Sequence, residues 1–160
     1  SSVTNMQLMF AGASNFNGDI SNWDVSSVTT MKGMFANVNS FNQDLSGWDV
    51  SSVTTMMQMF YNATSFNQDL SNWDVSSVAD MNGMFNFATE FNQDISDWNT
   101  SKVTDMSVLF SGKTSFNGDI KEWNVSGLDK PTDEQLATYE TAGNTEETNN
   151  TVRATRKAAY

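Results

Sequence analysis

The sequence predicts an α/β repeat solenoid of about five turns, in which each turn contributes a short parallel strand and a short helix. Three observations favour this class. A stretch of the form Phe-Asn-Gln-Asp-Leu-Ser-x-Trp-Asp-Val-Ser-Ser recurs every 25 residues without insertion or deletion. All five tryptophans and ten of the eleven phenylalanines keep this register. Within each period, apolar residues also follow two different rhythms, one suited to a helix and one to a strand.

The first rhythm predicts the helix. Val3, Met6, Met9 and Phe10 fall at i, i+3, i+6 and i+7, which makes one apolar face of a short helix. A serine lies one or two positions before each such segment, where it suits an N-cap. The small polar link that follows, residues 11–15 in the first copy, is expected to end the helix.

The second rhythm predicts the strand. In Trp23-Asp24-Val25 the side chains alternate inward, outward and inward, as they do in a β-strand. Neither element can bury its apolar side alone, so stacked turns are expected to enclose a core between a parallel sheet and a layer of helices. The expected aromatic core consists of Phe16, Trp23, Phe41, Trp48, Phe66, Trp73, Phe91, Trp98, Phe116 and Trp123.

The repeat pattern divides the chain into three parts. Residues 1–128 form the solenoid, and Ser1 enters partway through a repeat, which indicates a processed protein or an excised fragment. Residues 129–142 are expected to form a C-terminal cap helix, because Thr132-Asp133-Glu134-Gln135 resembles a capping box. Residues 143–160 are polar and are expected to be a flexible tail or a partner-docking peptide.

Composition excludes several classes of function. The chain has no cysteine and no histidine, so it lacks disulfides, thiolate metal sites and the commonest general base. The net charge of −11 repels nucleic acid phosphates and anionic lipid heads. No segment is apolar for long enough to cross a bilayer. We therefore expect no cofactor, no nucleic acid and no direct membrane insertion.

The full motif, Phe-Asn-Gln-Asp-[Leu/Ile]-Ser-x-Trp-Asp-Val-Ser-Ser-Val-Thr-x-Met-x-x-Met-Phe, resembles the 25–26-residue bacterial surface-protein repeat of the BspA-like leucine-rich-repeat family. The resemblance covers Val3 to about Gly127. It implies a leucine-rich-repeat-like solenoid on a secreted or cell-surface protein, with a role in adhesion or host contact. Residues from Asp129 onward have no counterpart in the motif.

Two polar ladders are expected to be structural. In the asparagine ladder, each amide would bond to the backbone of the adjacent turn, although a ligand groove is the alternative. In the first aspartate ladder, each carboxylate would accept N–H bonds at a turn. The alternative there is a cation site between adjacent turns, which makes calcium possible but not favoured. The residues are Asn17, Asn42, Asn67, Asn92 and Asn117, and Asp19, Asp44, Asp69, Asp94 and Asp119.

A third ladder occupies the outward position of the predicted strand. It gives an acidic stripe that is either a partner-binding face or merely solvated. Its members are Asp24, Asp49, Asp74, Asn99 and Asn124.

The expected function is that of a non-enzymatic protein-interaction or structural module at the cell surface or outside the cell. An enzyme needs an asymmetric group of residues, whereas every carboxylate pair here recurs in each turn; carboxylate-based glycan chemistry is a remote alternative. An ice-binding array is opposed by Ala79, which interrupts the threonine row of Thr29 and Thr54. The remaining alternatives are a calcium-stabilised or glycan-binding array, and an accessory or linker subunit docked within a larger assembly on the lumenal face of an organelle.

Overall fold

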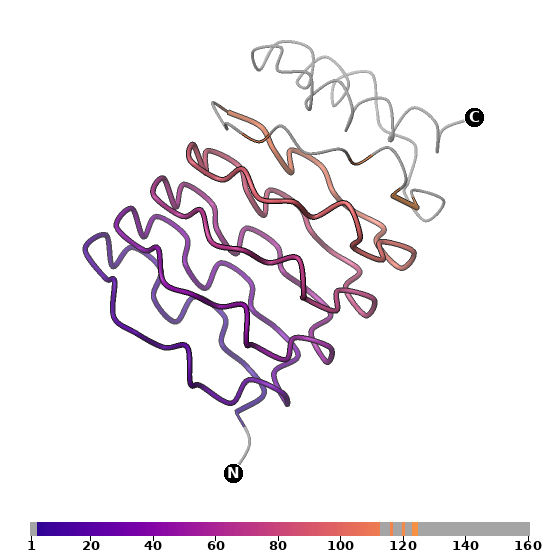
Figure 1. Ribbon diagram of the computed structural model, residues 1–160, viewed down its shortest axis with the longest axis horizontal. Helices are drawn as coiled ribbons and strands as arrows, with labels where there is room; N and C mark the ends of the chain where they lie inside the picture. The colour runs from indigo at the N-terminus through magenta and orange to yellow at the C-terminus, as the bar shows by residue number, and fades with distance from the viewer. Residues whose placement is uncertain (1–2, 113–115, 117–119, 121–122, 125–160) are drawn as a thin grey trace.

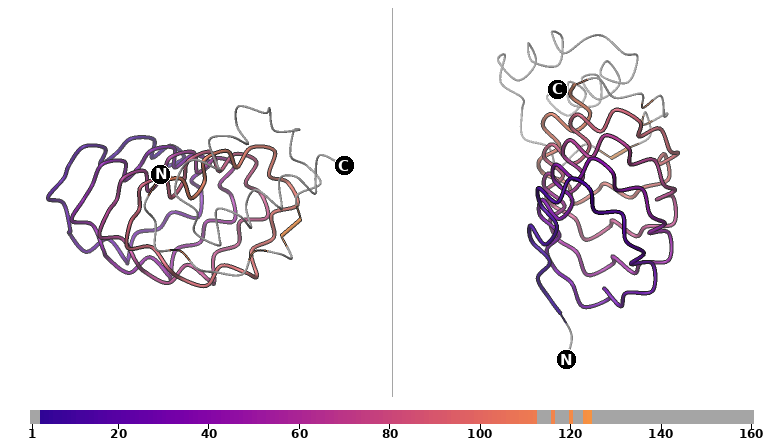
Figure 2. Two further views of the ribbon diagram at one scale, coloured as in Figure 1. Left: turned by 90° about the horizontal axis from the view of Figure 1, so that it is seen from above. Right: turned by 90° about the vertical axis from the view of Figure 1, so that its left-hand side faces the viewer.

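The computed structural model describes residues 3–112, 116, 120, 123 and 124, and these residues wind into a stack of similar coils (Figure 1). Each coil corresponds to one 25-residue period. The coils follow one another in a single direction, as the two side views show (Figure 2). We number them as coil 1 (3–27), coil 2 (28–52), coil 3 (53–77), coil 4 (78–102) and coil 5 (from 103). The expected cap at 129–142 and tail at 143–160 lie outside the described residues.

The predicted helix is wrong, because the described residues contain no helix at all. The segment consists of consecutive β-turns: the Met9 N–H donates to the Met6 carbonyl (3.3 Å) and the Ala13 N–H to that of Phe10 (2.9 Å). Leu8 (φ 57°) and Gly12 (φ 76°) hold the third position of two such turns, where a type II turn requires positive φ. The corresponding positive-φ residues of the other coils are Gly33, Asn37, Gln58, Asn62, Gly83, Phe87, Val108 and Gly112.

The predicted strand is also wrong. Within the described residues, extended pairing is limited to isolated parallel bridges that link Asn5, Thr30, Thr55, Asp80 and Asp105 in succession. The Trp-Asp-Val segments lie between turns that bend the chain every few residues. Because the chain never stays extended for long, no strand forms there, and a fold of strand-plus-helix turns is excluded.

Backbone hydrogen bonds nevertheless join each coil to the next. Between coils 3 and 4, the N–H groups of four alternate residues donate to carbonyls 24 positions later, and the Ala79 N–H donates back to the Thr54 carbonyl (2.8 Å). The four donor–acceptor pairs are Met56–Asp80 (2.9 Å), Gln58–Asn82 (2.8 Å), Phe60–Met84 (2.9 Å) and Asn62–Asn86 (2.8 Å). The intervening N–H groups bond within their own turn, as Met59 does to the Met56 carbonyl (3.0 Å). The backbone hydrogen-bonding groups of these consecutive turns are therefore satisfied partly within a coil and partly between coils.

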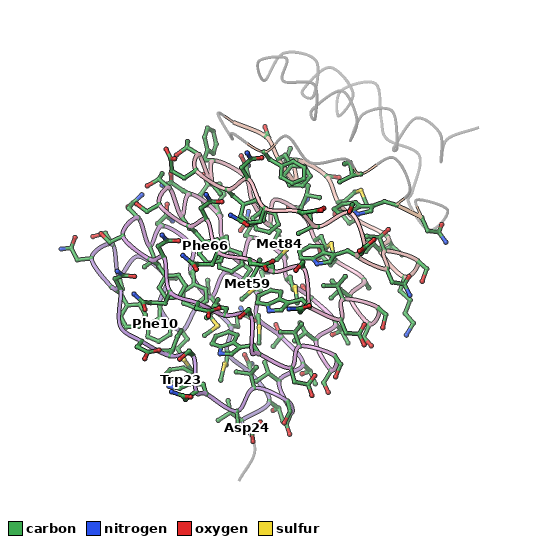
Figure 3. All side chains as sticks on the ribbon, viewed as in Figure 1. Phe10, Trp23, Asp24, Met59, Phe66 and Met84 are labelled. Atoms are coloured by element: carbon green, nitrogen blue, oxygen red, sulfur yellow. The ribbon has the colours of Figure 1, made fainter. Side chains whose placement is uncertain are left out.

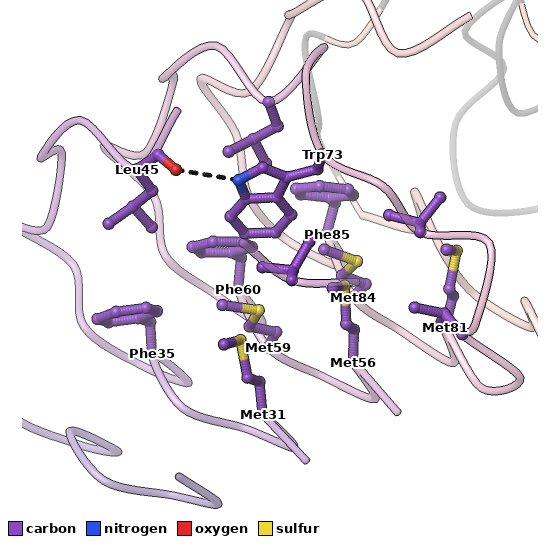
Figure 4. Packing of buried hydrophobic residues seen from close by; sticks show 14 of the residues in the cluster. Met31, Phe35, Leu45, Met56, Met59, Phe60, Trp73, Met81, Met84 and Phe85 are labelled. Atoms are coloured by element: carbon purple, nitrogen blue, oxygen red, sulfur yellow. Dashed lines mark hydrogen bonds between the residues drawn. The ribbon is translucent and has the colours of Figure 1, made fainter. Parts of the chain in front are cut away.

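The core consists of aromatic columns that run along the stack. The Phe60 and Phe66 rings lie 4.0 Å apart within coil 3, and Phe60 stacks on Phe85 of coil 4 at 5.7 Å. Both columns continue through all five coils, as Phe10, Phe35, Phe60, Phe85 and Phe110, and as Phe16, Phe41, Phe66, Phe91 and Phe116. Buried methionines such as Met59 and Met84 fill the space beside them (Figures 3 and 4). Apolar burial and ring stacking therefore act between coils as well as within them.

Candidate functional site: the side-chain ladders

The asparagine side chains bridge neighbouring coils. The Oδ1 atom of Asn42 accepts from the backbone N–H of Asn67 (2.9 Å) and from Nε2 of Gln68 (2.9 Å). The same pair of bonds surrounds Asn17 and Asn67, with donors from the following coil. Asn92 lies at the same position of coil 4, and Asn117 lies outside the described residues. The glutamine that follows each of these asparagines in coils 2 to 4 was not singled out by sequence reasoning.

The aspartates of the first ladder close short turns within their own coil. The Oδ1 atoms of Asp19, Asp44, Asp69 and Asp94 each accept the backbone N–H of the serine two residues later, at 2.8–3.0 Å. This is the Asx-turn, in which a carboxylate replaces a backbone acceptor. Asp119 lies outside the described residues. The part of the chain that the structure describes holds no group of three or more carboxylates placed to bind a metal ion.

Hydrogen bonds from serine lower the pKa of the Asp19, Asp44 and Asp94 carboxyl groups. Bonds to Ser46, from its hydroxyl and then from its backbone N–H, hold the pKa of Asp44 below its ordinary value. The negative charge of Asp19 opposes this effect by a smaller amount. The pKa values of Asp19 and Asp94 are lowered by the equivalent serines, in both cases chiefly through the backbone N–H. At Asp44, the stabilisation of the charged form by Ser46 thus exceeds the repulsion from Asp19 of the preceding coil.

The third ladder is exposed along the side of the stack. Oδ1 of Asp49 accepts the hydroxyl (2.6 Å) and the backbone N–H (3.1 Å) of Ser51, and these bonds lower the pKa of Asp49. Asp24 and Asp74 are held by their serines in the same way. Asn99 replaces the aspartate in coil 4, yet its Oδ1 still accepts the N–H of Ser101 (3.2 Å). Asn124 is exposed at the next position.

Acid is expected to destabilise the fold. The Asp19, Asp44 and Asp49 carboxyl groups have lower pKa values in the folded chain than in the unfolded chain, where aspartate has a pKa of about 3.9. The unfolded chain therefore takes up protons first as the pH falls. Their contribution is present above about pH 5 and is lost progressively below about pH 4. Thermal melts between pH 7 and pH 2.5 test this prediction. A Tm that rises on acidification would mean that relief of charge repulsion dominates instead.

The aromatic residues expected in the core are buried in every coil except the first. Trp23 is 39% exposed and Phe16 is partly buried, whereas the eight equivalents in later coils are buried. Each buried tryptophan also donates Nε1–H to a carbonyl 28 residues earlier, as Trp73 does to Leu45 at 3.0 Å (Figure 4). This tryptophan ladder could not be predicted from the sequence, because nothing in a repeat motif indicates which carbonyl an indole will reach.

The described residues include no helix that is both long and apolar enough to cross a membrane. A family model matches residues 1–81 and 44–147, and its description reads "Mycoplasma protein of unknown function, DUF285". The two overlapping matches reflect the internal repeat. Comparison with curated proteins and with solved structures found no significant match.

Proposed function

The chain belongs to this DUF285 family of repeat proteins, and we propose that it acts as a non-enzymatic module that binds a protein partner. The proposed binding face is the acidic row of Asp24, Asp49, Asp74, Asn99 and Asn124. The observation that carries the proposal is the way in which these side chains are fixed. Asp24 and Asp49 each accept both the hydroxyl and the backbone N–H of their serine at Oδ1, so their Oδ2 atoms have no partner among the described residues. Asp74 accepts the Ser76 N–H at Oδ1 in the same way.

Such a row favours a partner of particular chemistry. Exposed carboxylate oxygens that repeat once per coil in coils 1 to 3, followed by the amides of Asn99 and Asn124, form a regular line of acceptors on a chain with a net charge of −11. Because their rotamers are already held by hydrogen bonds, little side-chain entropy is lost when a partner binds. Arginine and lysine side chains are the donors that such a line attracts. We therefore propose a basic protein surface as the partner.

A non-enzymatic role is supported by the regularity of the chain. The carboxylates, amides and hydroxyls of the ladders occupy equivalent environments in successive coils, so the ladder residues that the structure describes include no distinct acid–base pair. Chemistry at a substrate generally needs two such groups whose environments differ. Measured turnover of any glycan by the purified chain would contradict this proposal.

The proposed location is the cell surface or the extracellular space. It is supported by the resemblance of the motif to the BspA-like family, and we propose kinship with that family on the motif alone, without a strand-plus-helix fold. The alternative is an accessory or linker subunit within a larger, membrane-associated assembly. Light scattering after size exclusion distinguishes the two: a soluble monomer supports the surface module, and insolubility without a partner supports the subunit.

The binding face is tested with the triple variant Asp24→Asn, Asp49→Asn, Asp74→Asn. The fold is expected to survive, because Asn99 already makes the same turn with an amide. The matched control is Asp19→Asn, Asp44→Asn, Asp69→Asn, which removes the same charge from the first ladder. Pull-down from the native source, followed by washes of rising salt, should lose the partner in the first variant and keep it in the control. Equal capture by both variants would contradict the assignment of this face.

Calcium is expected to leave the Tm nearly unchanged. The Asp19, Asp44, Asp69 and Asp94 carboxylates are already bonded to serine N–H groups, so a cation would gain little by bridging coils. Thermal melts in millimolar calcium and in chelator provide the measurement. A rise of several degrees that Asp69→Asn abolishes would instead make this a calcium-stabilised array.

A further inference from the structure

At one turn, at a corner of the stack, coil 4 differs from the other coils in the type of residue that it places at a positive-φ position. The position occupied by Gly12, Asn37, Asn62 and Gly112 in the other coils has positive φ in every case. Glycine and asparagine adopt this left-handed conformation at low cost, whereas a bulky side chain does not. Coil 4 places Phe87 there, with φ 58°. Phe87 is also the one phenylalanine outside the 25-residue register.

Burial in the core does not compensate for the cost of the left-handed backbone conformation at Phe87. The Phe87 side chain is 44% exposed and belongs to neither phenylalanine column. Its ring meets the Tyr61 ring of coil 3 edge to face, with centroids 6.1 Å apart. On the side of coil 5 it lies over Gly112, where an added Cβ would be only 2.5 Å from the ring. An aromatic pair is thus held at the surface by residues of three successive coils.

The amides at this corner leave acceptors open. Asn62 Nδ2 donates to Asn37 Oδ1 (2.9 Å), and an asparagine in coil 4 would continue this pairing. Because Phe87 stands there instead, nothing among the described residues donates to Asn62 Oδ1. The preceding residue, Asn86, has a buried Oδ1 that also lacks a donor. Coil 4 therefore combines two destabilising features, the positive φ of Phe87 and the buried Asn86 Oδ1 without a donor. Uncompensated features of this kind concentrate at functional sites.

Charge limits the class of ligand. The described residues at these two positions of each coil are uncharged, although the chain as a whole carries a net charge of −11. They are Ala11, Gly12, Ala36, Asn37, Tyr61, Asn62, Asn86, Phe87, Ser111 and Gly112. An uncharged corner that offers an exposed ring and an open amide acceptor suits a neutral molecule with an apolar face and hydroxyl donors. A pyranose ring has both features.

We propose that the Tyr61–Phe87 corner is a binding site for a neutral saccharide. The C–H face of a sugar ring packs on the exposed Phe87 ring, and a sugar hydroxyl donates to Asn62 Oδ1. Tyr61 and Gly112 act as positioning residues: the first fixes the ring by its edge contact, and the second leaves the space in which the ring lies. This site goes beyond the proposed function, since it needs neither the acidic row nor a protein partner.

The test is a titration of the whole chain with neutral hexasaccharides of glucose, mannose and N-acetylglucosamine, followed by saturation-transfer NMR. Phe87→Asn restores the residue type found at this position in coils 2 and 3. It is expected to weaken binding by at least about tenfold, as loss of a central aromatic contact does, and to keep or raise the Tm. Phe87→Tyr should retain binding. The matched control is Met9→Gln, which removes another exposed apolar side chain (45% exposed) and should bind as the wild type does.

Three results would overturn the proposal. The first is the absence of saturation transfer to every hexasaccharide. The second is unchanged binding by Phe87→Asn, and the third is a lower Tm for that variant, which would show that Phe87 serves the fold. Capture of a protein partner that depends on Phe87, without saccharide binding, would reassign the corner to protein recognition.

Discussion

Replacing Trp73 with alanine is expected to lower the free energy of unfolding by about 3–5 kcal/mol, the range for large aromatic truncations in a core. Trp73 is 3% exposed and packs at a tilt against Phe60, with ring centroids 6.3 Å apart. Its loss leaves a cavity in the middle of the stack and removes the donor to the Leu45 carbonyl (3.0 Å). Urea unfolding followed by circular dichroism measures the change.

Trp23 provides the control within the same register. It is 39% exposed, and none of the described residues accepts a hydrogen bond from its Nε1. Trp23→Ala is therefore expected to cost only about 1–2 kcal/mol, since a smaller apolar area returns to water and no bond is lost. Trp73→Phe separates the two contributions, because it keeps most of the ring contact and loses the Nε1 donor. Equal losses for Trp23→Ala and Trp73→Ala would contradict a stack in which neighbouring coils stabilise one another.

The repeat itself could be predicted from the sequence, because aromatic side chains that recur every 25 residues need equivalent environments. The family match supports a repeat domain. The helix could not be distinguished from consecutive turns by apolar spacing alone. Met6 and Met9 lie three residues apart, and a β-turn brings residues at this spacing together as a helix does. Both structures therefore produce the same hydrophobic pattern.

Some signals of the turns were present in the sequence. Gly33 and Asn37 lie four positions apart in coil 2, and residues of these types favour positive φ, which no α-helix of L-residues uses. The Asp-x-Ser spacing at Asp44 and Ser46 likewise indicates an Asx-turn. Val108 and Phe87 gave no such signal, because side chains of these types rarely adopt the left-handed region that they occupy here. Such positions can be identified only from the structure.

Among the ladder residues, the chemistry of the individual side chains was easier to predict than their partners. An amide in equivalent positions of stacked turns has few uses other than bonding to its neighbours. The choice of Gln68 and of the Asn67 N–H as donors to Asn42 depends on the geometry between coils. The corner at Phe87 was missed for a related reason. Its significance depends on backbone φ, and a single phenylalanine outside the register carries no information about φ.

Deleting the whole of coil 3, residues 53–77, is expected to harm the protein less than deleting Gln58 alone. Removal of 25 residues joins Ser52 to Val78, and Val78 occupies the same register position as Val53. The N–H groups of coil 2 then meet the carbonyls of coil 4 in place of those of coil 3. The result is a shortened stack with one interface fewer. In such arrays the free energy of unfolding falls roughly by the contribution of one repeat and of one interface between neighbours.

In coils 1 to 4, N–H groups that bond to the next coil alternate with N–H groups that bond within their own turn. Deleting Gln58 shifts this alternation by one residue. In the intact coil the Gln58 N–H bonds to Asn82 and the Met59 N–H bonds within its turn. After the deletion Met59, which is fully buried, takes the place of a partly exposed residue with φ 55°. Phe60 is displaced from its column in the same way, as side chains are when a strand slips by one residue.

The expected loss for this variant is on the order of 5 kcal/mol or more, since two large buried side chains and several hydrogen bonds are misplaced together. A loss of that size approaches the whole stability of many domains, so the coils around the deletion should unfold. Urea titration of both deletion variants measures the difference, and the m-value reports how many coils remain folded. A Gln58-deleted chain that is as stable as the 25-residue deletion would show that the coils tolerate a change of length. The fixed 25-residue period would then lack a structural cause.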